Sequence, residues 1–361
     1  MTFPVAWSTI IPTKRRQEAI EGLLLGCAVA EALSIQYSAL PPRTKHSMRR
    51  GPVGVLTSMQ AMPGHRTHSI VMAVQSLLTS KADIEPFLAM LQSRLAWYRS
   101  SHPMRAMLGR VSGSMRAELD NDPLIRSALL SVVLQGHNES ARTWISHSTK
   151  YACTDEVVVR AAMLVAMAAQ CAQVLRTNHP FDPQQLLPFM ADHVGDDSLR
   201  RSLMRLDQLL AQRASVNRAA RSLGCMRGVH DHLIENALLA IYTFCLHSAS
   251  YRMGIEAVVR LPGDTTGIAS LAGCLLGAAG GVRSIPESWL DRVSMQPYND
   301  EWIAEYVERV HDWPHGPEDI QATASLSALP MGQLWRNAVQ VIADAQLQWI
   351  RWGLKRPRVR A

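Results

Sequence analysis

One stretch of the chain combines the apolar character of a buried helix with almost no side-chain bulk. Residues 267–279 read GIASLAGCLLGAA, carry no charge and are mostly glycine, alanine or serine. Each glycine inside a helix costs about 1 kcal/mol relative to alanine. That cost makes sense where a neighbouring helix packs against the backbone at short distance. Residues 17–34 form a second such segment, in which Gly22 and Gly26 lie among apolar residues. The chain is therefore predicted to fold around closely packed helices.

Helical periodicity continues along most of the chain. Aromatic residues make up 6% of the sequence, strand signals are scarce, and helix formers dominate. Asp83 is a predicted N-cap, and Pro123 stands at a favourable first-turn position. No period of about 20–50 residues recurs, which disfavours a solenoid. Helices are predicted over 17–34, 68–79, 84–99, 123–136, 140–150, 155–176, 183–193, 197–213, 232–249, 251–260, 267–279, 301–311 and 331–353.

These segments predict an all-α fold, a compact orthogonal bundle of many helices. A length of 361 residues with 47% hydrophobic content is enough for a sizeable core. The all-α domain is predicted to span 1–300. Residues 301–361 are predicted to add a C-terminal helical extension with a basic tail, packed on the same domain. The most apolar segments should lie at the centre, namely 20–33, 68–78, 158–172 and 267–279.

Charge, cysteine content and hydropathy limit the class of protein. A formal net charge of +7 permits contact with phosphate or an anionic surface without requiring it. The six cysteines include no CxxC pair, so reduced core thiols are favoured over a disulfide framework or a zinc site. The N-terminus lacks the pattern of a signal peptide, and no uninterrupted apolar run approaches the roughly 20 residues of a membrane span. We expect a cytoplasmic protein.

A turn and three oxygen-bearing side chains precede the small-residue segment. Pro262-Gly263 end the preceding helix, and Asp264 is predicted to cap the helix that follows at the positive end of its dipole. Thr265 and Thr266 offer two more oxygens. On this fragment alone, the favoured interpretation is a capped, closely packed core helix.

Several segments, in order, resemble the ADP-ribosylglycohydrolase family. GDTTGIASLAGCLLGAAGG, followed by IPESW, is similar to the family's GGDTDTxxxIAGALLGAxxG and IPxxW. EGLLLGCAVAEALS resembles its opening helix GxLxGxAxGDALG, and MPGHRTHSIVMAVQSLL takes the place of xxxTDDTxMALALAESLL. Residues 148–162 and 228–265 resemble two further segments. The resemblance covers roughly residues 15–295 and implies the family's all-α fold.

The resemblance also implies a metal site. In the family, the acids and threonines of TDDT and GDTDT hold a pair of magnesium ions, which help to orient ADP-ribose and a water at the scissile bond. Magnesium prefers hard oxygen ligands in octahedral geometry. Two divalent ions a few ångströms apart need several carboxylates to offset their mutual repulsion.

This chain departs from the family at most of those positions. Only Thr67, Asp264 and Thr265 match cleanly, and a fixed cation, Arg66, replaces one acid. An arginine there would repel a dication, and would instead pair with Asp264 or attract a phosphate. The residues at the family's positions are Gly64, His65, Arg66 and Thr67 for TDDT; Gly263, Asp264, Thr265, Thr266 and Gly267 for GDTDT; and Glu31, Ser38 and Cys153 for an aspartate, a glutamate and a histidine elsewhere.

Three hypotheses about function follow. The first is a catalytically impaired family member, without a magnesium pair or any other expected cofactor, that binds ADP-ribose or a nucleotide. The second is an active hydrolase in which Glu31, His65 or Asp155 helps Asp264. The third is an interaction protein that meets a protein partner through its basic C-terminal helix. No catalytic residue is assigned, and Asp264 and Thr67 are at most a metal-binding remnant. The candidate ligand-binding residues are His65, Arg66, Thr67, Arg126, Cys153, Asp264, Thr265 and Thr266.

For each of the other polar features, a functional and a structural interpretation stay open. Arg126 resembles a residue of the family's AMRxxPL helix, and either lines the cleft or forms a structural ion pair. A transition-metal site of His65, His68, Cys153 and Asp264 is less favoured than polar residues with satisfied hydrogen bonds. For 230–232, HDH, exposed polar residues are likewise favoured over a metal site. The amphipathic, basic segment 331–361 is favoured as a docking helix, while contact with a membrane surface or nucleic acid stays open.

Overall fold

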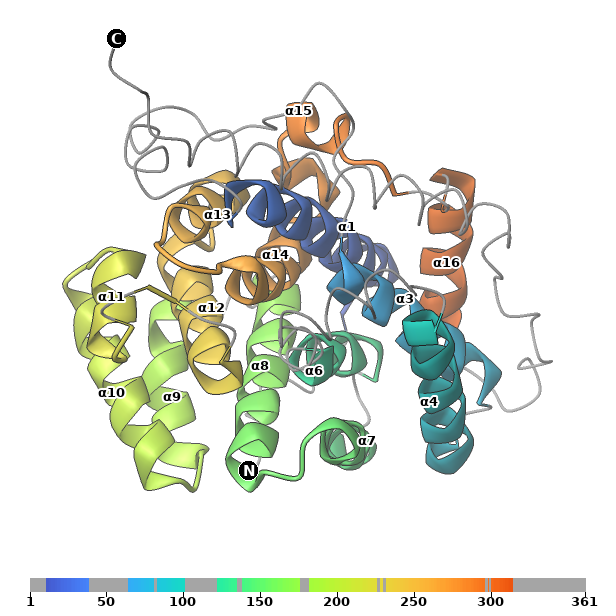
Figure 1. Cartoon of the computed structure of the whole chain (residues 1–361), viewed down its shortest axis with the longest axis horizontal. Helices are drawn as coiled ribbons and strands as arrows, with labels where there is room; N and C mark the ends of the chain where they lie inside the picture. The colour runs from blue at the N-terminus through green and yellow to red at the C-terminus, as the bar shows by residue number, and fades with distance from the viewer. Residues whose placement is uncertain are drawn as a thin grey trace, which may run out of the picture.

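The computed structural model describes residues 11–38, 64–80, 83–100, 122–134, 138–175, 182–225, 228–229, 232–295, 298 and 300–313. Within these residues the fold is all-α, as predicted, and an isolated parallel bridge joins Val229 to Gly263. The helices are α1 (Thr13–Ser38), α3 (His65–Thr79), α4 (Ile84–Ser100), α6 (Asp122–Val133), α7 (Asn138–Ala152), α8 (Glu156–Val174), η4 (Pro183–Gln185), α9 (Leu186–His193), α10 (Asp197–Ala211), α11 (Val216–Ser222), α12 (Leu233–His247), α13 (Tyr251–Val259), α14 (Thr266–Gly280), η5 (Val282–Ser284), α15 (Glu287–Leu290) and α16 (Asp300–Asp312). Figure 1 shows α1 crossing the view, while α4, α8 and α16 run up and down it.

Most of the predicted helices are confirmed, and the differences lie at their ends and in short elements. α3 begins three residues before the predicted start at 68, and the predicted helix 183–193 is divided into η4 and α9. The short helices α11 and α15 were not predicted. The predicted helix 331–353 and the basic tail lie outside the described residues. The predicted centre is confirmed, because α1, α3, α8 and α14 are buried along most of their length.

The innermost contact is an antiparallel pair of helices, α1 and α14. Gly22 and Gly26 of α1 lie against Gly277 and Gly273 of α14, respectively. A Cβ atom added at any of these four glycines would lie under 3.0 Å from a backbone oxygen of the partner helix. Since side chains essentially never come that close to backbone, only glycine permits this spacing. The close approach predicted from the small-residue segments is confirmed.

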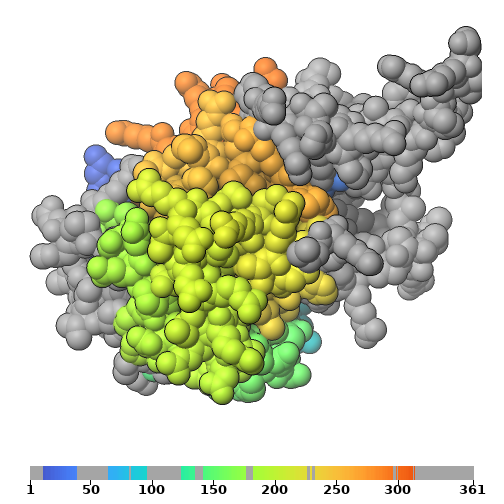
Figure 2. All heavy atoms as spheres, turned by 90° about the vertical axis from the view of Figure 1, so that its left-hand side faces the viewer, coloured from blue at the N-terminus to red at the C-terminus, as the bar shows by residue number. Residues whose placement is uncertain are grey.

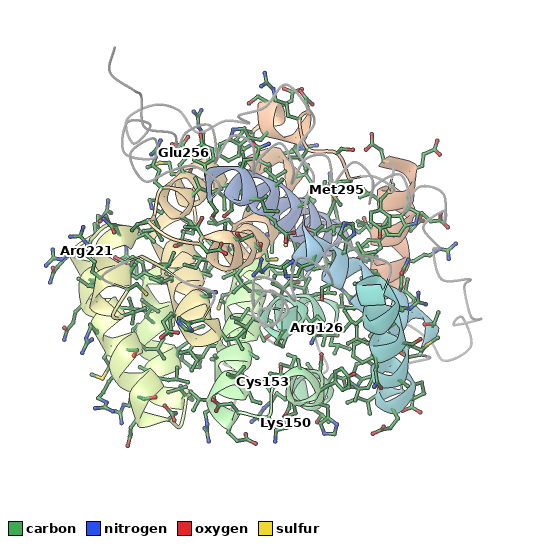
Figure 3. The ribbon with its side chains drawn as sticks, viewed as in Figure 1. Arg126, Lys150, Cys153, Arg221, Glu256 and Met295 are labelled. Carbon is green, nitrogen blue, oxygen red and sulfur yellow. The ribbon has the colours of Figure 1, made fainter. Side chains whose placement is uncertain are left out.

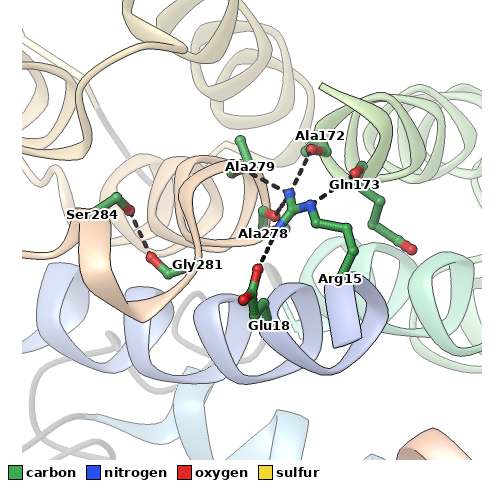
Figure 4. Close-up of polar contacts among 8 residues, drawn as sticks. All are labelled: Arg15, Glu18, Ala172, Gln173, Ala278, Ala279, Gly281 and Ser284. Atoms are coloured by element: carbon green, nitrogen blue, oxygen red, sulfur yellow. Dashed lines mark hydrogen bonds and ion pairs between the residues drawn. The ribbon is translucent and has the colours of Figure 1, made fainter. Parts of the chain in front are cut away.

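Arg15, in the first turn of α1, holds the C-terminal ends of two helices (Figure 4). Its Nε donates to the Gln173 carbonyl oxygen at 3.1 Å, and its Nη2 donates to that of Ala172 at 3.2 Å, both at the end of α8. The same Nη2 donates to the carbonyl oxygens of Ala278 and Ala279, at 2.6 and 2.9 Å, at the end of α14. These carbonyls lack helical partners and lie at the negative end of each dipole, so a buried cation stabilises both ends.

Arg16 does the same for two further helices. Its Nη2 donates to the Val133 carbonyl oxygen at the end of α6, at 2.5 Å, and to the Trp313 carbonyl oxygen just after α16, at 3.3 Å. Four helix ends therefore converge on one turn of α1. Neither role was predicted from the sequence.

The predictions about cysteine pairing and about membrane spans have different outcomes. All six cysteines are free, as predicted, and four of them are buried. By length and composition α8 is apolar enough to cross a membrane, which the sequence analysis did not anticipate. However, 83% of the apolar stretch of α8 is buried inside the structure, and the core helix of a soluble protein passes the same test of length and composition.

The glycine contact predicts a large difference between two Gly→Ala substitutions. Gly277→Ala should lower the free energy of unfolding by about 3 kcal/mol, because the new methyl group forces two backbones apart. Gly254→Ala on α13 is the matched control, since its Cβ would meet the movable Leu276 Cδ1 and side chain atoms of two other residues. The control should change stability by less than about 1 kcal/mol. Urea denaturation measures both, and equal losses would contradict the proposed contact.

Arg15→Lys should destabilise the fold by about 2–3 kcal/mol, because one ammonium group cannot span two helix ends and leaves buried carbonyls unpaired. Arg252→Lys serves as the control, since Arg252 is exposed and pairs with Glu256, four residues later. Its effect should stay within about 0.5 kcal/mol. Thermal and urea unfolding of both variants give the comparison. If Arg252→Lys lost as much stability as Arg15→Lys, the proposed stabilisation of two helix ends by Arg15 would be contradicted.

Candidate functional site

The C-terminal half of α1 meets the first turns of α3 and α14, and this junction gathers several of the candidate residues. Thr67 reaches α1 from α3, and Thr265 reaches it from the residue before α14. α1 contributes Glu31, Ser34 and Ser38. Because α1 and α14 are antiparallel, the start of α14 lies beside the C-terminal turns of α1.

Glu31 binds the first turn of α3 with both carboxylate oxygens. The side chain is fully buried, at 0% exposure. Its Oε1 accepts the Arg66 backbone N–H at 3.0 Å, and its Oε2 accepts the Thr67 backbone N–H at 3.0 Å and the Thr67 hydroxyl at 2.7 Å. A helix start offers unpaired N–H donors and a positive dipole end, so it can hold a buried carboxylate. Glu31 thus caps α3 from another helix.

Close contact at this cap also explains the glycine before α3. A Cβ atom at Gly64 would lie 2.6 Å from Glu31 Oε1. Gly64 therefore leaves room for the carboxylate, in addition to starting the helix.

Cys27 lies one turn before Glu31 on α1 and contacts the same threonine. The Thr67 hydroxyl lies 3.8 Å from Cys27 Sγ. Burial, and secondarily the neighbouring Cys274 thiol, raise the pKa of Cys27 well above its usual value. Cys27 is therefore a neutral thiol, which is unsuited to nucleophilic attack.

Thr265 bonds to α1 through its hydroxyl group. Its Oγ1 lies 2.8 Å from the Ser34 hydroxyl and 3.4 Å from that of Ser38, and its backbone N–H donates to Ser38 Oγ at 3.4 Å. Thr265 is fully buried. The hydroxyl that matches the family motif is thus tied to two serines of α1.

Asp264 is exposed and bonds within its own turn. Its Oδ1 accepts the Thr266 backbone N–H at 3.0 Å and the Thr266 hydroxyl at 2.6 Å. The predicted capping by Asp264 is met in part, because its carboxylate accepts the N–H of Thr266, the first residue of α14, while Thr265 occupies the N-cap position without a side-chain capping bond. The Asp264 N–H donates to the Val229 carbonyl oxygen at 2.9 Å, and Gly263 adopts φ +96° beside that strand-like bridge.

The remaining α3 candidates, His65 and Arg66, are buried in its first turn. Arg66 is 3% exposed, and its backbone N–H is the donor to Glu31. His68 follows on the same helix, with its ring centroid 5.7 Å from that of Tyr298. These side chains therefore lie inside the molecule rather than on its surface.

Arg126 and Cys153, which Figure 3 labels, belong to α6 and to the segment after α7 rather than to the three elements of this junction. Arg126 is 1% exposed and donates to Ser148 Oγ at 3.2 Å, to the Ser148 carbonyl oxygen at 3.4 Å and to Ser69 Oγ at 3.4 Å. It links α6 to α7 and α3. Cys153 is half-buried just after α7, where its N–H donates to the Thr149 carbonyl oxygen at 2.9 Å.

The other proposed helpers and metal ligands are not brought together. In the part of the chain that the structure describes, no three His, Cys, Asp or Glu side chains gather as a metal site, so His65, His68, Cys153 and Asp264 do not form one. Asp155 caps α8 by accepting the Val157 N–H at 2.9 Å. Residues 230 and 231 lie outside the described residues, and His232 directly precedes α12.

Sequence reasoning missed Ser34 and the capping role of Glu31. The signal that was available is a polar stripe on an otherwise apolar helix. Cys27, Glu31, Ser34 and Ser38 are spaced by four, three and four residues, which puts them on one face of α1. That face is the one that meets Thr67 and Thr265.

One comparison with known proteins identifies a family. The sequence model of the ADP-ribosylglycohydrolase family matches residues 12–319. A solved chain described as an ADP-ribosylglycohydrolase-related protein complex is similar at 20% identity, with a TM-score of 0.48, over 82% of this chain and 97% of that chain. No curated protein matches the chain.

The Glu31 cap predicts a strong effect of a nearly isosteric change. Glu31→Gln should lower the free energy of unfolding by about 2–3 kcal/mol, because the amide group turns a donor toward N–H groups that need an acceptor. Exchange of the Thr67 amide hydrogen should become faster in the same variant. Glu287→Gln, at an exposed position in the first turn of α15, is the control. Equal free energies of unfolding for Glu287→Gln and Glu31→Gln would contradict the role of Glu31 as the cap of α3.

Proposed function

Because the chain belongs to the ADP-ribosylglycohydrolase family, we propose that it keeps the family fold but works without a magnesium pair, as a binding protein for ADP-ribose or a related nucleotide. One observation carries the proposal. Glu31, the carboxylate that stands at one of the family's acidic positions, is fully buried and accepts three hydrogen bonds from the first turn of α3. Its oxygens therefore already have protein donors.

The other matching groups support the same conclusion. The Thr67 hydroxyl donates to Glu31, and the Thr265 hydroxyl is shared with Ser34. Asp264 Oδ1 accepts two hydrogen bonds from Thr266. At these positions, side-chain oxygens are thus already engaged in hydrogen bonds with other protein groups.

The residues present do not fit two magnesium ions. Two dications need several carboxylates, and at the family's positions this chain offers Glu31 and Asp264. Arg66 adds a fixed positive charge at a position where the family has an acid, and that charge raises the energy of any cation nearby. No catalytic step is therefore derived through a metal.

Arg66 supplies the chemistry for a ligand instead. A guanidinium group binds phosphate oxygens with paired, charge-assisted hydrogen bonds. ADP-ribose and nucleotides carry such phosphates. Because Arg66 is 3% exposed, a diphosphate would have to enter the junction to reach it. In this proposal, Arg66 then provides the positive charge that the diphosphate needs in the absence of magnesium.

The alternative of an active hydrolase finds less support. It needs Asp264 to act with Glu31, His65 or Asp155, yet Glu31 caps α3 and Asp155 caps α8. The alternative of an interaction protein depends on residues 331–361, which lie outside the described residues.

Isothermal titration calorimetry with ADP-ribose tests the proposal. Binding should be equally tight with magnesium and with EDTA. Arg66→Ala should weaken it at least tenfold, which corresponds to about 1.4 kcal/mol for the lost phosphate contacts. Arg283→Ala, at an exposed position in η5, is the control and should bind as the wild type does.

A gain-of-function variant sharpens the test of the metal site. The triple variant His65→Asp, Arg66→Asp, Thr266→Asp restores acids at the family's positions, and should bind magnesium more tightly than the wild type by calorimetry. Circular dichroism confirms that each variant folds. Magnesium-dependent binding by the wild type would contradict the proposal. So would turnover of ADP-ribosyl-arginine that disappears in Asp264→Asn.

A further inference from the structure

The hairpin of α10 and α11 carries an unbalanced positive charge. Figure 2 shows this hairpin in yellow-green on the face turned toward the viewer. From Ser198 to Cys225 the sequence contains six arginines, all exposed, and a single carboxylate, Asp207, which is half-buried. The arginines are Arg200, Arg201, Arg205, Arg213, Arg218 and Arg221.

The excess of positive charge is greatest away from the start of α10. Asp196 and Asp197 lie at that start, one turn from Arg200 and Arg201. The other four, Arg205, Arg213, Arg218 and Arg221, lie on or beside α11, and we call them the α11 arginine cluster. Arg205 Nη1 donates to the Ser222 carbonyl oxygen at 2.7 Å, which brings the middle of α10 to the end of α11. Figure 3 places Arg221 at the outer edge of the molecule.

No carboxylate of the described residues neutralises the α11 arginine cluster. Among the described residues, none of its four side chains forms an ion pair with a carboxylate, whereas Arg252 and Arg260 pair with Glu256, and Arg309 with Glu305. Unpaired like charges repel one another across a shared surface. An anionic partner would relieve that repulsion.

Arg213 gives a second, independent indication. It occupies the C′ position of α10 with φ +48°, and it is the one non-glycine residue with positive φ in the described part of the chain. The Arg213 N–H donates to the Leu210 carbonyl oxygen and the Ala214 N–H to that of Leu209, which is a Schellman motif. Glycine is the usual residue there because it adopts this conformation without strain. An arginine that is strained in the folded state points to a use for its side chain.

The composition of the hairpin selects the kind of partner. A protein partner normally needs an apolar patch at the centre of its interface, and the one large exposed hydrophobic residue of the hairpin is Met204. Single-stranded nucleic acid is held largely by stacking on aromatic rings, and residues 198–225 contain no aromatic residue. A double helix needs neither, because its phosphates alone supply most of the non-specific affinity.

We propose that the α11 arginine cluster binds the phosphate backbone of a nucleic-acid duplex without reading its sequence. This surface differs from the junction of α1, α3 and α14, and from the basic segment 331–361. The proposal therefore stands independently of ADP-ribose binding.

Fluorescence anisotropy with the full chain tests it, using labelled DNA and RNA duplexes of about 20 base pairs at about 50 and 200 mM salt. If the four arginines each contact a phosphate, the affinity for DNA should fall about 100-fold between the two salt concentrations. The two duplexes distinguish DNA from RNA as the source of the backbone. Unlabelled duplexes of unrelated sequence should compete equally.

Arg213→Gly separates binding from folding. It should weaken duplex binding and lower the salt slope by about 1, while raising Tm, because glycine relieves the strained backbone. Arg218→Gln should also lower the slope by about 1 with little change in Tm. Arg283→Gln and Arg292→Gln are the controls, since both replace exposed arginines elsewhere in the chain.

Three outcomes would overturn the proposal. The first is no binding to either duplex at the lower salt concentration. The second is binding that Arg213→Gly and Arg218→Gln weaken no more than the controls do, which would assign it to another basic segment. The third is tighter, cluster-dependent binding to polyglutamate than to a duplex, which would point to an acidic protein.

Discussion

The contact between Gly22 and Gly26 of α1 and Gly277 and Gly273 of α14 sets the register on which the other interactions depend. With the two backbones in contact, the first turn of α1 lies at the end of α14, where Arg15 reaches two helix ends. The last turns of α1 lie at the start of α14, where Ser34 reaches Thr265. A bulkier residue at the crossing would displace both ends together, because helices transmit such shifts along their length.

α1 stabilises opposite ends of its neighbours with opposite charges. Its first turn presents Arg15 and Arg16 to carbonyl groups at helix ends, and its second half presents Glu31 to N–H groups at a helix start. A buried charge is costly unless it is hydrogen-bonded, and helix termini are the places where the backbone has unpaired groups. The charges of α1 are thus buried at sites where the backbone can satisfy them. Glu31 is part of the fold's structure as well as of the candidate site.

The sequence predicted the helices and the close packing well, because both follow from local periodicity and residue size. It missed α11 and α15, which have seven and four residues and are too short to show a periodic pattern. It also missed the carbonyl partners of Arg15, which lie 157 or more residues away in the chain. Family motifs located Thr67, Asp264 and Thr265, but not the bonds that these residues make. Those bonds depend on long-range packing, which motif spacing does not contain.

The antiparallel pairing of α1 with α14 also has a consequence for biosynthesis. α1 ends at Ser38 and α14 begins at Thr266, so roughly 230 residues must be translated between them. At about 5–20 residues per second, the nascent chain carries the apolar face of α1 without its partner for tens of seconds. Native closure of the core is therefore a late, non-local event on the ribosome, and the long sequence separation of the two helices slows it further. Chaperone engagement should be greatest before α14 emerges from the exit tunnel.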